Sequence, residues 1–230
     1  ITATINKASA TVTADSLVTT YNGATQFLLS NNFSASGLVN GETKTVLTNV
    51  SASGQGINTG TYTTTASGVD SNYILTFVPG TLRISPKPLN TLVTKTYDGS
   101  STFNSGFVFS GTVTGETTPT ATGSAAVSSQ NAGLYSSFAT NGLTLSNSNY
   151  TLSGGLVSAT INQKPLNTLV AKTYDGSTTF NSGFVFTGTV TGETSPTATG
   201  SATVSSKNVG LYSSFATNGL TLSNSNYTLS

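Results

Sequence analysis

The heptapeptide KPLNTLV occupies residues 87–93 and returns unchanged at residues 164–170, 77 positions later. Aligned from these starting points, residues 87–153 and 164–230 differ at seven of 67 positions. The differences are all small or polar exchanges: Thr94/Ala171, Ser101/Thr178, Ser110/Thr187, Thr118/Ser195, Ala126/Thr203, Gln130/Lys207 and Ala132/Val209. Because no large apolar residue changes, the alignment predicts a duplicated module whose hydrophobic core is held fixed.

A third, divergent copy precedes these two. Four short motifs occur in the same order in every copy: Tyr-Asn/Asp-Gly, Gly-Glu-Thr, Asn-x-Gly-x-Tyr and Ser-Asn-Tyr. They begin at Tyr21, Gly41, Asn58 and Ser71, then at Tyr97, Gly115, Asn131 and Ser148, and then at Tyr174, Gly192, Asn208 and Ser225. The sequence therefore predicts repeat 1 at residues 8–86, repeat 2 at 87–163 and repeat 3 at 164–230.

The ends of the repeats predict an open sheet edge. Repeats 1 and 2 finish in short strand-like segments at residues 81–84 and 158–161. Residues 1–7 resemble the last strand of a preceding module, and repeat 3 is expected to lack its own last strand. An unpaired edge accepts strands from other chains. We therefore expect residues 1–6 of one molecule to complete repeat 3 of another, and the chain to be an internal piece of a longer protein.

The local pattern is that of β-strands. Phe107, Phe109 and Val113 share one face of a predicted strand, while Ser110 and Thr112 share the other. Helix signals are scarce, and turn residues recur about every eight to twelve positions. The predicted fold class is all-β, with tandem small immunoglobulin-like modules and β-grasp-like modules as the alternative. The short, proline-containing connections at 85–88 and 162–165 predict an elongated, semi-rigid rod.

One motif favours the immunoglobulin-like alternative. Asn-x-Gly-x-Tyr resembles the tyrosine corner of such domains, in which a Tyr hydroxyl bonds to nearby backbone. The tyrosines in that role would be Tyr62, Tyr135 and Tyr212, and the glycines that permit the tight corner would be Gly60, Gly133 and Gly210. A β-grasp arrangement would use a similar turn, so both alternatives stay open.

The composition excludes several classes of protein. Charged residues make up 7% of the chain, with eight basic and seven acidic, so no field favours nucleic acid or anionic lipid. The 11 Phe and nine Tyr argue against disorder, and no apolar run is long enough to span a membrane. Cysteine is absent, so each module depends on its core. A weakly charged surface rich in Thr, Ser, Asn and Gly is typical of exported bacterial proteins.

Catalysis has few candidate residues in this sequence. Histidine and cysteine are absent, which excludes most nucleophile–base pairs and most transition-metal sites. Asp98 with Glu116, and Asp175 with Glu193, could form glycosidase-like carboxylate pairs. The plainer interpretation is that Asp98 caps a turn and Glu116 sits in a hairpin loop. Calcium-loop spacing is also absent. We expect no enzyme activity, no metal and no cofactor.

Two further kinds of site have plainer alternatives. Lys95 and Lys172, with Glu116 and Glu193 downstream, could form Lys–Asn isopeptide crosslinks, but Thr19 takes the corresponding place in repeat 1. A solvated lysine that discourages edge pairing explains them as well. The aromatic residues Tyr97, Tyr174, Phe103 and Phe180 could form a platform for sugars, with Tyr97, Asp98, Tyr174 and Asp175 as ligand-binding candidates. Core packing is the alternative.

The four motifs together resemble the YDG and MBG repeat domains of large bacterial adhesins and filamentous-haemagglutinin-like exoproteins. Residues 87–230 resemble the YDG type and residues 8–86 the MBG type, with Asn22 in place of the Asp. The resemblance implies an extracellular location at the bacterial cell surface and a role as extender or adhesive repeat in cell adhesion or biofilm formation.

Two functional classes remain open. In the first, the repeats are structural, pack against neighbouring repeats of the same chain and project a distal binding region. In the second, each repeat binds host or matrix glycans or proteins weakly and gains avidity from number. Neither class involves nucleic acid or membrane insertion of this segment.

Overall fold

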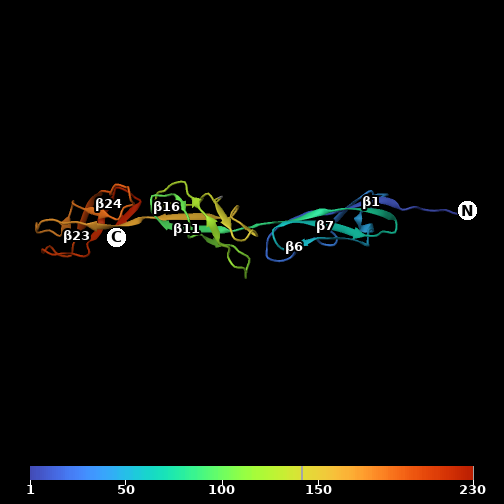
Figure 1. Ribbon diagram of the computed structural model, residues 1–230, viewed down its shortest axis with the longest axis horizontal. Coiled ribbons are helices and arrows are strands. Elements are labelled where there is room, and N and C mark those ends of the chain that lie inside the picture. The colour runs from blue at the N-terminus through green and yellow to red at the C-terminus, as the bar shows by residue number, and fades with distance from the viewer. Residues whose placement is uncertain (141, 230) are drawn as a thin grey trace. The chain divides into compact units, whose positions relative to one another are not determined.

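The computed structural model describes residues 1–140 and 142–229 (Figure 1). Short β-strands dominate it, and the described residues contain one 3-10 turn, η1 at Lys44–Val46, and no α-helix. The all-β prediction is therefore confirmed. None of the helical structure in these residues is long and apolar enough to cross a membrane.

The chain forms two compact units. The first contains residues 1–90, 110–120 and 145–155, and the second contains residues 91–109, 121–144 and 156–230. The division falls within predicted repeat 2, which contributes segments to both units. The assignment of three repeats is kept as a prediction, and each unit is described separately.

The first unit has two main sheets, and each contains one parallel pair of strands. One sheet has the order β4-β1-β8 and the other β2-β9-β7-β5. The strands are β1 (Ala8–Ala14), β2 (Leu17–Thr20), β4 (Phe33–Ser36), β5 (Val50–Ser53), β7 (Gly60–Gly68), β8 (Tyr73–Val78) and β9 (Gly80–Ser85). β1 runs parallel to β8, and β2 runs parallel to β9. This pairing departs from the antiparallel pattern of immunoglobulin sandwiches.

Alternation along β1 places the core of the first unit. Val12 and Ala14 are buried and pack with Phe33, Leu47 and Tyr73 in one hydrophobic cluster. Between β8 and β9 the chain passes close to the end of β1. A side chain at Gly80 would lie 2.3 Å from the Ala14 carbonyl oxygen, so the crossing requires glycine.

The main sheet of the second unit has the order β13-β11-β19-β16. Its strands are β11 (Asn90–Thr96), β13 (Val108–Ser110), β16 (Gly133–Tyr135) and β19 (Val157–Asn162). β19 lies between β11, to which it is parallel, and β16, to which it is antiparallel. It turns Ala159 and Ile161 into the core. The strands predicted at 81–84 and 158–161 therefore exist, within β9 and β19.

The smaller sheets link segments within each unit or along repeat 2. They pair β3 (Gln26–Phe27) with β6 (Gln55–Gly56), β10 (Lys87–Pro88) with β18 (Tyr150–Thr151), β12 (Thr102–Phe103) with β15 (Ala125–Ala126), and β14 (Ala121–Gly123) with β17 (Leu143–Leu145). The strand predicted around residues 107–113 is shorter in the structure and covers β13 alone. Phe109 is its buried residue.

Repeat 3 has a shorter central strand than repeat 2. Its sheets are β22-β20-β25 and β21-β23-β24, formed by β20 (Lys164–Leu169), β21 (Thr179–Phe180), β22 (Val185–Thr187), β23 (Ala198–Thr203), β24 (Ala216–Leu222) and β25 (Tyr227–Leu229). β20 ends at Leu169, whereas the equivalent strand in repeat 2 continues to Thr96 beside β19. No strand among the described residues takes the place of β19 in repeat 3. Residues 1–7 are exposed and form no strand.

Candidate interaction sites at the repeat boundaries

A glutamate of repeat 2 binds two tyrosines, one from repeat 1 and one from its own repeat. Glu116 accepts a hydrogen bond from the Tyr21 hydroxyl at 2.5 Å on Oε1 and from the Tyr150 hydroxyl at 2.7 Å on Oε2. The two tyrosine rings pack edge to face, with centroids 5.6 Å apart. These three residues, here called joint 1, all belong to the first unit.

The same cluster recurs between repeats 2 and 3. Glu193 accepts hydrogen bonds from Tyr97 on Oε1 and from Tyr227 on Oε2, both at 2.6 Å. The rings are again edge to face, at 5.5 Å. This joint 2 lies within the second unit, and its tyrosines belong to a hydrophobic cluster that mixes residues of both repeats. Edge-to-face pairs and charge-assisted hydrogen bonds are both stronger than ordinary contacts.

The glutamates are presented by a tight turn. The Glu116 amide donates to the Val113 carbonyl at 3.1 Å, and Gly115, with φ +88°, occupies the third position of the turn. A positive φ at that position is the signature of a type II turn, which favours glycine. The Val113 amide in turn donates to the Tyr150 hydroxyl at 3.0 Å. The Gly-Glu-Thr motif therefore fixes the carboxylate against the tyrosine of the Ser-Asn-Tyr motif.

Each joint shifts the pKa values of its own members. Hydrogen bonding to Glu116, followed by burial, raises the pKa of Tyr21 to about 12. Burial, followed by hydrogen bonding to Glu193, raises the pKa of Tyr97 to about 12. The tyrosine hydroxyls lower the pKa values of Glu116 and Glu193 by stabilising the carboxylates. The joints therefore favour an ionised glutamate between neutral tyrosines.

At each boundary between repeats, an asparagine of the later repeat also bonds to the earlier repeat, a contact here called the asparagine clamp. The Asn149 side chain accepts a hydrogen bond from the Thr59 amide at 2.9 Å and donates one to the Asn58 side chain at 3.0 Å. The Asn226 side chain makes the equivalent bonds to the Ala132 amide, at 2.7 Å, and to Asn131, at 3.1 Å. The Ser-Asn-Tyr motif of one repeat thus binds the Asn-x-Gly-x-Tyr loop of the repeat before it.

A glycine contact completes the packing. Gly23 follows Tyr21 with φ +78°, and a side chain there would lie 2.8 Å from Cγ1 of Val113 in the next repeat. Gly99 has the same φ, and its side chain would lie 3.2 Å from Val190. At Gly176 of repeat 3, a side chain would meet no atom within 4 Å. All four recurring motifs therefore take part in contacts between successive repeats.

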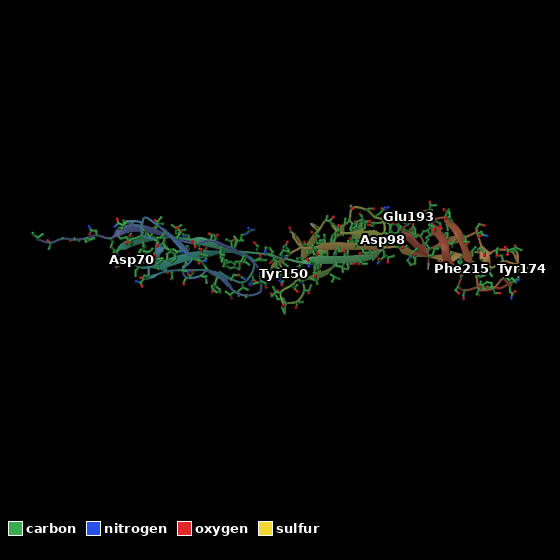
Figure 2. The ribbon with its side chains drawn as sticks, turned by 180° about the vertical axis from the view of Figure 1, so that it is seen from behind. Asp70, Asp98, Tyr150, Tyr174, Glu193 and Phe215 are labelled. Atoms are coloured by element: carbon green, nitrogen blue, oxygen red, sulfur yellow. The ribbon has the colours of Figure 1, made fainter. Side chains whose placement is uncertain are left out.

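Repeats 1 and 3 each contain joint residues that have no partner from another repeat among the described residues. Glu42 of repeat 1 accepts a hydrogen bond from Tyr73 of the same repeat, at 2.5 Å on Oε2. Its other oxygen has no hydrogen-bond partner among residues 1–140 and 142–229. At the other end, Tyr174 of repeat 3, which is labelled in Figure 2, is 60% exposed, whereas the equivalent Tyr97 is 2% exposed.

The carboxylates of the two predicted pairs bind different partners. Asp98 lies 2.7 Å from the Lys95 Nζ and accepts the Ser100 amide at 2.9 Å, which is the turn-capping role. Asp175 does the same with Lys172 and Ser177. Glu116 and Glu193 instead bind the tyrosines of the joints. The contacts of these residues therefore follow the plainer interpretation of Asp98 as a turn residue, and the glutamates are engaged by tyrosine hydroxyls.

Lys95 lies on β11, whereas Lys172, also predicted on a strand, lies beyond the end of β20, and each lysine is bonded to the loop that follows it. Lys95 Nζ donates to the carbonyls of Ser100 and Thr102, at 2.6 and 2.9 Å, and lies 5.0 Å from the centre of the Phe103 ring. Lys172 repeats these contacts. With Asp98 and Asp175, these are the partners described for the two lysines, and they include no glutamate and no asparagine side chain.

The tyrosines of the Asn-x-Gly-x-Tyr motif bond to the backbone four residues earlier. Tyr62, Tyr135 and Tyr212 donate to the carbonyls of Asn58, Asn131 and Asn208, at 2.8, 2.6 and 2.5 Å. Only the first of the three motif glycines has a positive φ, +154° at Gly60. Side chains at Gly133 and Gly210 would make ordinary contacts with the tyrosine ring. The hydroxyl bond recurs in every repeat, and the conformational need for glycine does not.

The four candidate aromatic residues do not share one surface. Tyr97 and Phe103 are buried in the core of the second unit. Phe180 is half-buried beneath Lys172, and Tyr174 is exposed. A sugar-stacking platform formed from Tyr97 and Phe103 is therefore unavailable. Groups of three or more acidic side chains that could hold a metal ion are not found in the described residues.

The recurring motifs contain the residues that form the joints, but the sequence analysis did not predict that these residues contact one another. Glu116 has the pattern of a loop residue, and Asn149 that of a turn. One signal could have identified them. A tyrosine, a glutamate and an asparagine recur at equivalent positions of every repeat, although the chain has only seven acidic residues. Such residues have no role in an apolar core, which points to contacts outside the repeat.

Comparison with known protein families finds a match to one family model. Residues 2–83 match the family model of the MBG domain (YGX type), beginning ahead of the predicted start of repeat 1 at residue 8. No curated protein and no solved structure matches the chain. The resemblance that the motifs indicated is thereby confirmed over residues 2–83, which match the MBG domain of the YGX type.

Proposed function

We propose that this chain is a run of extracellular structural repeats from a bacterial surface adhesin, with no enzymatic activity of its own. In this role the repeats extend the protein from the cell and carry a distal binding region in cell adhesion or biofilm formation. The MBG domain at residues 2–83 supports the adhesin assignment, because domains of this family are typical of surface adhesins.

One observation carries the extender role. At both boundaries, the motifs that recur in every repeat bind the neighbouring repeat through a tyrosine–glutamate–tyrosine joint and an asparagine clamp. A flexible tether needs no such contacts. Repeats whose shared residues are committed to their neighbours are suited to bearing load along a chain, as in other repeat proteins in which each unit contacts the next.

The alternative, weak glycan binding by each repeat, has less support. Sugar-binding surfaces usually present aromatic faces. Tyr97, the aromatic residue of the Tyr-Asp-Gly motif in repeat 2, is buried against Tyr227, and Phe103 is buried as well. The repeat therefore uses its aromatic residues for packing between modules.

Adhesion under flow tests the extender role. The chain is displayed on bacteria between a surface anchor and a distal antigen-binding module, and retention on antigen-coated glass is compared between native chain and the Tyr21→Ala/Tyr97→Ala double variant. We expect the variant to lose retention at high shear at equal surface level. Val69→Ala, an exposed position away from both joints, is the control and should retain cells like the native chain. Equal retention by native chain and double variant would contradict the role.

A glycan array separates the two candidate functions. The isolated chain should give no saturable signal, because Tyr97 and Phe103, two of the four aromatic candidates, are buried. Reproducible and saturable binding to one class of glycan would overturn the purely structural assignment and favour the alternative.

A further inference from the structure

Tyrosine is the most readily oxidised side chain in this sequence. Cysteine and methionine, which oxidants usually modify first, are absent, and so are tryptophan and histidine. The chain has nine tyrosines. A tyrosine that loses one electron and its hydroxyl proton becomes a phenoxyl radical, and two such radicals combine when their rings are close together. One-electron oxidation of this chain therefore ends on tyrosine.

Each joint holds two tyrosine rings from successive repeats against each other. The rings of Tyr21 and Tyr150 have centroids 5.6 Å apart, and those of Tyr97 and Tyr227 have centroids 5.5 Å apart. In each pair, both hydroxyls bind the two oxygens of one carboxylate. Because the hydroxyl ends converge, the ring carbons next to the hydroxyls are held near one another. All four rings are buried, which shields their radicals from other molecules.

The shared glutamate supplies the proton acceptor that the oxidation requires. A phenol that gives up an electron also gives up its hydroxyl proton, and the joint hydroxyls already donate to Glu116 or Glu193. The hydroxyls of Tyr62 and Tyr212 instead donate to backbone carbonyls, which are far weaker bases. We propose that a diffusible one-electron oxidant, of the class of radicals formed from hydrogen peroxide, joins the two tyrosines of each joint by a carbon–carbon bond.

The reaction removes two electrons and two protons from each joint. The oxidant takes one electron from each ring, and the two hydroxyl protons pass in turn to the carboxylate and from there to solvent. The radicals couple through the ring carbons next to the hydroxyls. The hydrogens on those two carbons then move to the oxygens and restore the hydroxyls. Each crosslink therefore leaves the chain lighter by two hydrogen atoms, with the glutamate ionised as before.

The two crosslinks bond successive repeats covalently in a chain that has no cysteine. One closes a loop over residues 21–150 and the other over residues 97–227, and the two loops share residues 97–150. Closing long loops restricts the unfolded chain and so stabilises the folded one. A gain in resistance to load rests on the proposed extender role, whereas the coupling itself depends only on the joints and is tested separately.

Photochemical oxidation of the full chain tests the coupling. A ruthenium trisbipyridyl complex with persulfate supplies the one-electron oxidant, and the chain is kept dilute so that molecules rarely meet. Tryptic peptides are then analysed by mass spectrometry. Two crosslinked pairs should dominate, each two hydrogens lighter than the sum of its peptides: 8–44 with 96–172 for joint 1, and 96–172 with 208–230 for joint 2.

Single substitutions assign each crosslink to its tyrosines. Tyr21→Phe should remove the first crosslink and keep the second, and Tyr227→Phe should do the reverse. Tyr174→Phe, at a tyrosine that is exposed to the oxidant, is the control and should keep both. Oxidation of the chain unfolded in urea should abolish the preference for the joint pairs, because the rings are then no longer held together.

Each joint is the internal reference for the other in a test of the glutamate. Glu116→Gln keeps the size of the side chain but removes its ability to take up a proton. The yield of the joint 1 crosslink should therefore fall at least about tenfold, while that of joint 2 is unchanged. Crosslinks scattered among the tyrosines of the folded chain, oxidised joint tyrosines that do not couple, or equal yields from Glu116→Gln and native chain would overturn the proposal.

Discussion

Tyr97 and Tyr174 occupy equivalent positions in two repeats that differ at seven of 67 residues, yet their surroundings are opposite. Tyr97 is enclosed by Glu193 and Tyr227 of the next repeat, whereas Tyr174 is exposed. The difference arises from the contact with a neighbouring repeat rather than from the sequence of the repeat itself. Equivalent residues of repeats 2 and 3, such as Tyr97 and Tyr174, can therefore serve as matched controls for each other in mutagenesis.

The glycines of the Tyr-Asn/Asp-Gly motif allow one such comparison. Gly23→Ala and Gly176→Ala both place a side chain at a φ near +77°, which costs about 1 kcal/mol of unfolding free energy through backbone strain. Only Gly23→Ala also sets its side chain against Val113 and the Glu116 carboxylate. We expect Gly23→Ala to be the more destabilising, as measured by urea unfolding at a concentration where the chain is monomeric. Equal losses would show that the valine contact carries no packing constraint.

The free energy of unfolding should fall at both low and high pH. The joints lower the pKa values of Glu116 and Glu193, so their contribution is present above the ordinary glutamate pKa of about 4.3 and is lost as the pH falls through the lowered values. The joints raise the pKa values of Tyr21 and Tyr97 to about 12. The contribution of the two tyrosines to the free energy of unfolding is therefore present below about pH 10 and is lost as the pH rises from there through about 12.

Unfolding free energy measured between pH 3 and pH 12 should form a plateau that falls at both ends. In the Tyr21→Phe/Tyr97→Phe variant, which cannot ionise at these positions, the alkaline fall should become shallower while the acid fall persists through Tyr150 and Tyr227. An unchanged alkaline limb in the variant would show that these two hydroxyls do not govern it.

Local sequence patterns at this scale identified the motifs but not their partners. Tyr21 and Glu116 are 95 positions apart, and nothing local in either motif indicates that they meet. The interpretation of Asp98 as a turn residue needed only its neighbours, since both of its hydrogen-bond donors, Lys95 and Ser100, lie within three positions. Local hydrogen bonds are therefore readable from sequence, and bonds between repeats require the packing of whole modules.

At the scale of elements, the strand β19 distinguishes repeat 2 from repeat 3. Its parallel pairing protects residues 91–96 of β11 along one edge. The corresponding residues after β20 have no such neighbour in the described structure. Whether a segment such as 170–173 forms a strand is thus decided by the presence of a partner, since its sequence differs from that of 93–96 only at Ala171.

Amide hydrogen exchange checks this statement directly. In the monomeric chain, the amides of residues 94–96 should exchange at least about tenfold more slowly than those of residues 171–173, because only the former are in a paired strand. Exchange measured by mass spectrometry on peptides from the two repeats makes the comparison. Similar protection of both segments would mean that repeat 3 is closed by some other part of the chain.

Alternation in the sequence predicted the strands within β9 and β19 and the all-β class. It did not predict that the first and last strands of the repeats would run parallel. Alternation fixes which face of a strand is buried, as at Ala159 and Ile161, but parallel and antiparallel neighbours bury the same face. The orientation depends on the route of the intervening chain, which no local pattern encodes.

At the scale of the whole molecule, stability is expected to be the sum of repeat terms and of terms for each boundary, as in other repeat proteins. With 7% charged residues, long-range electrostatics contribute little, and each joint contains one half-buried carboxylate, Glu116 or Glu193. Repeats with weak cores of their own would therefore be stabilised by their neighbours.

The coupling across joint 2 tests this account most directly. A double-mutant cycle by urea unfolding combines Tyr97→Phe, in repeat 2, with Glu193→Ala, in repeat 3, and a control cycle combines Tyr174→Phe with Glu193→Ala. We predict that the first pair departs from additivity by more than about 0.5 kcal/mol and that the control pair is additive. Additive effects in both cycles would contradict the claim that successive repeats are joined through the tyrosine–glutamate–tyrosine clusters.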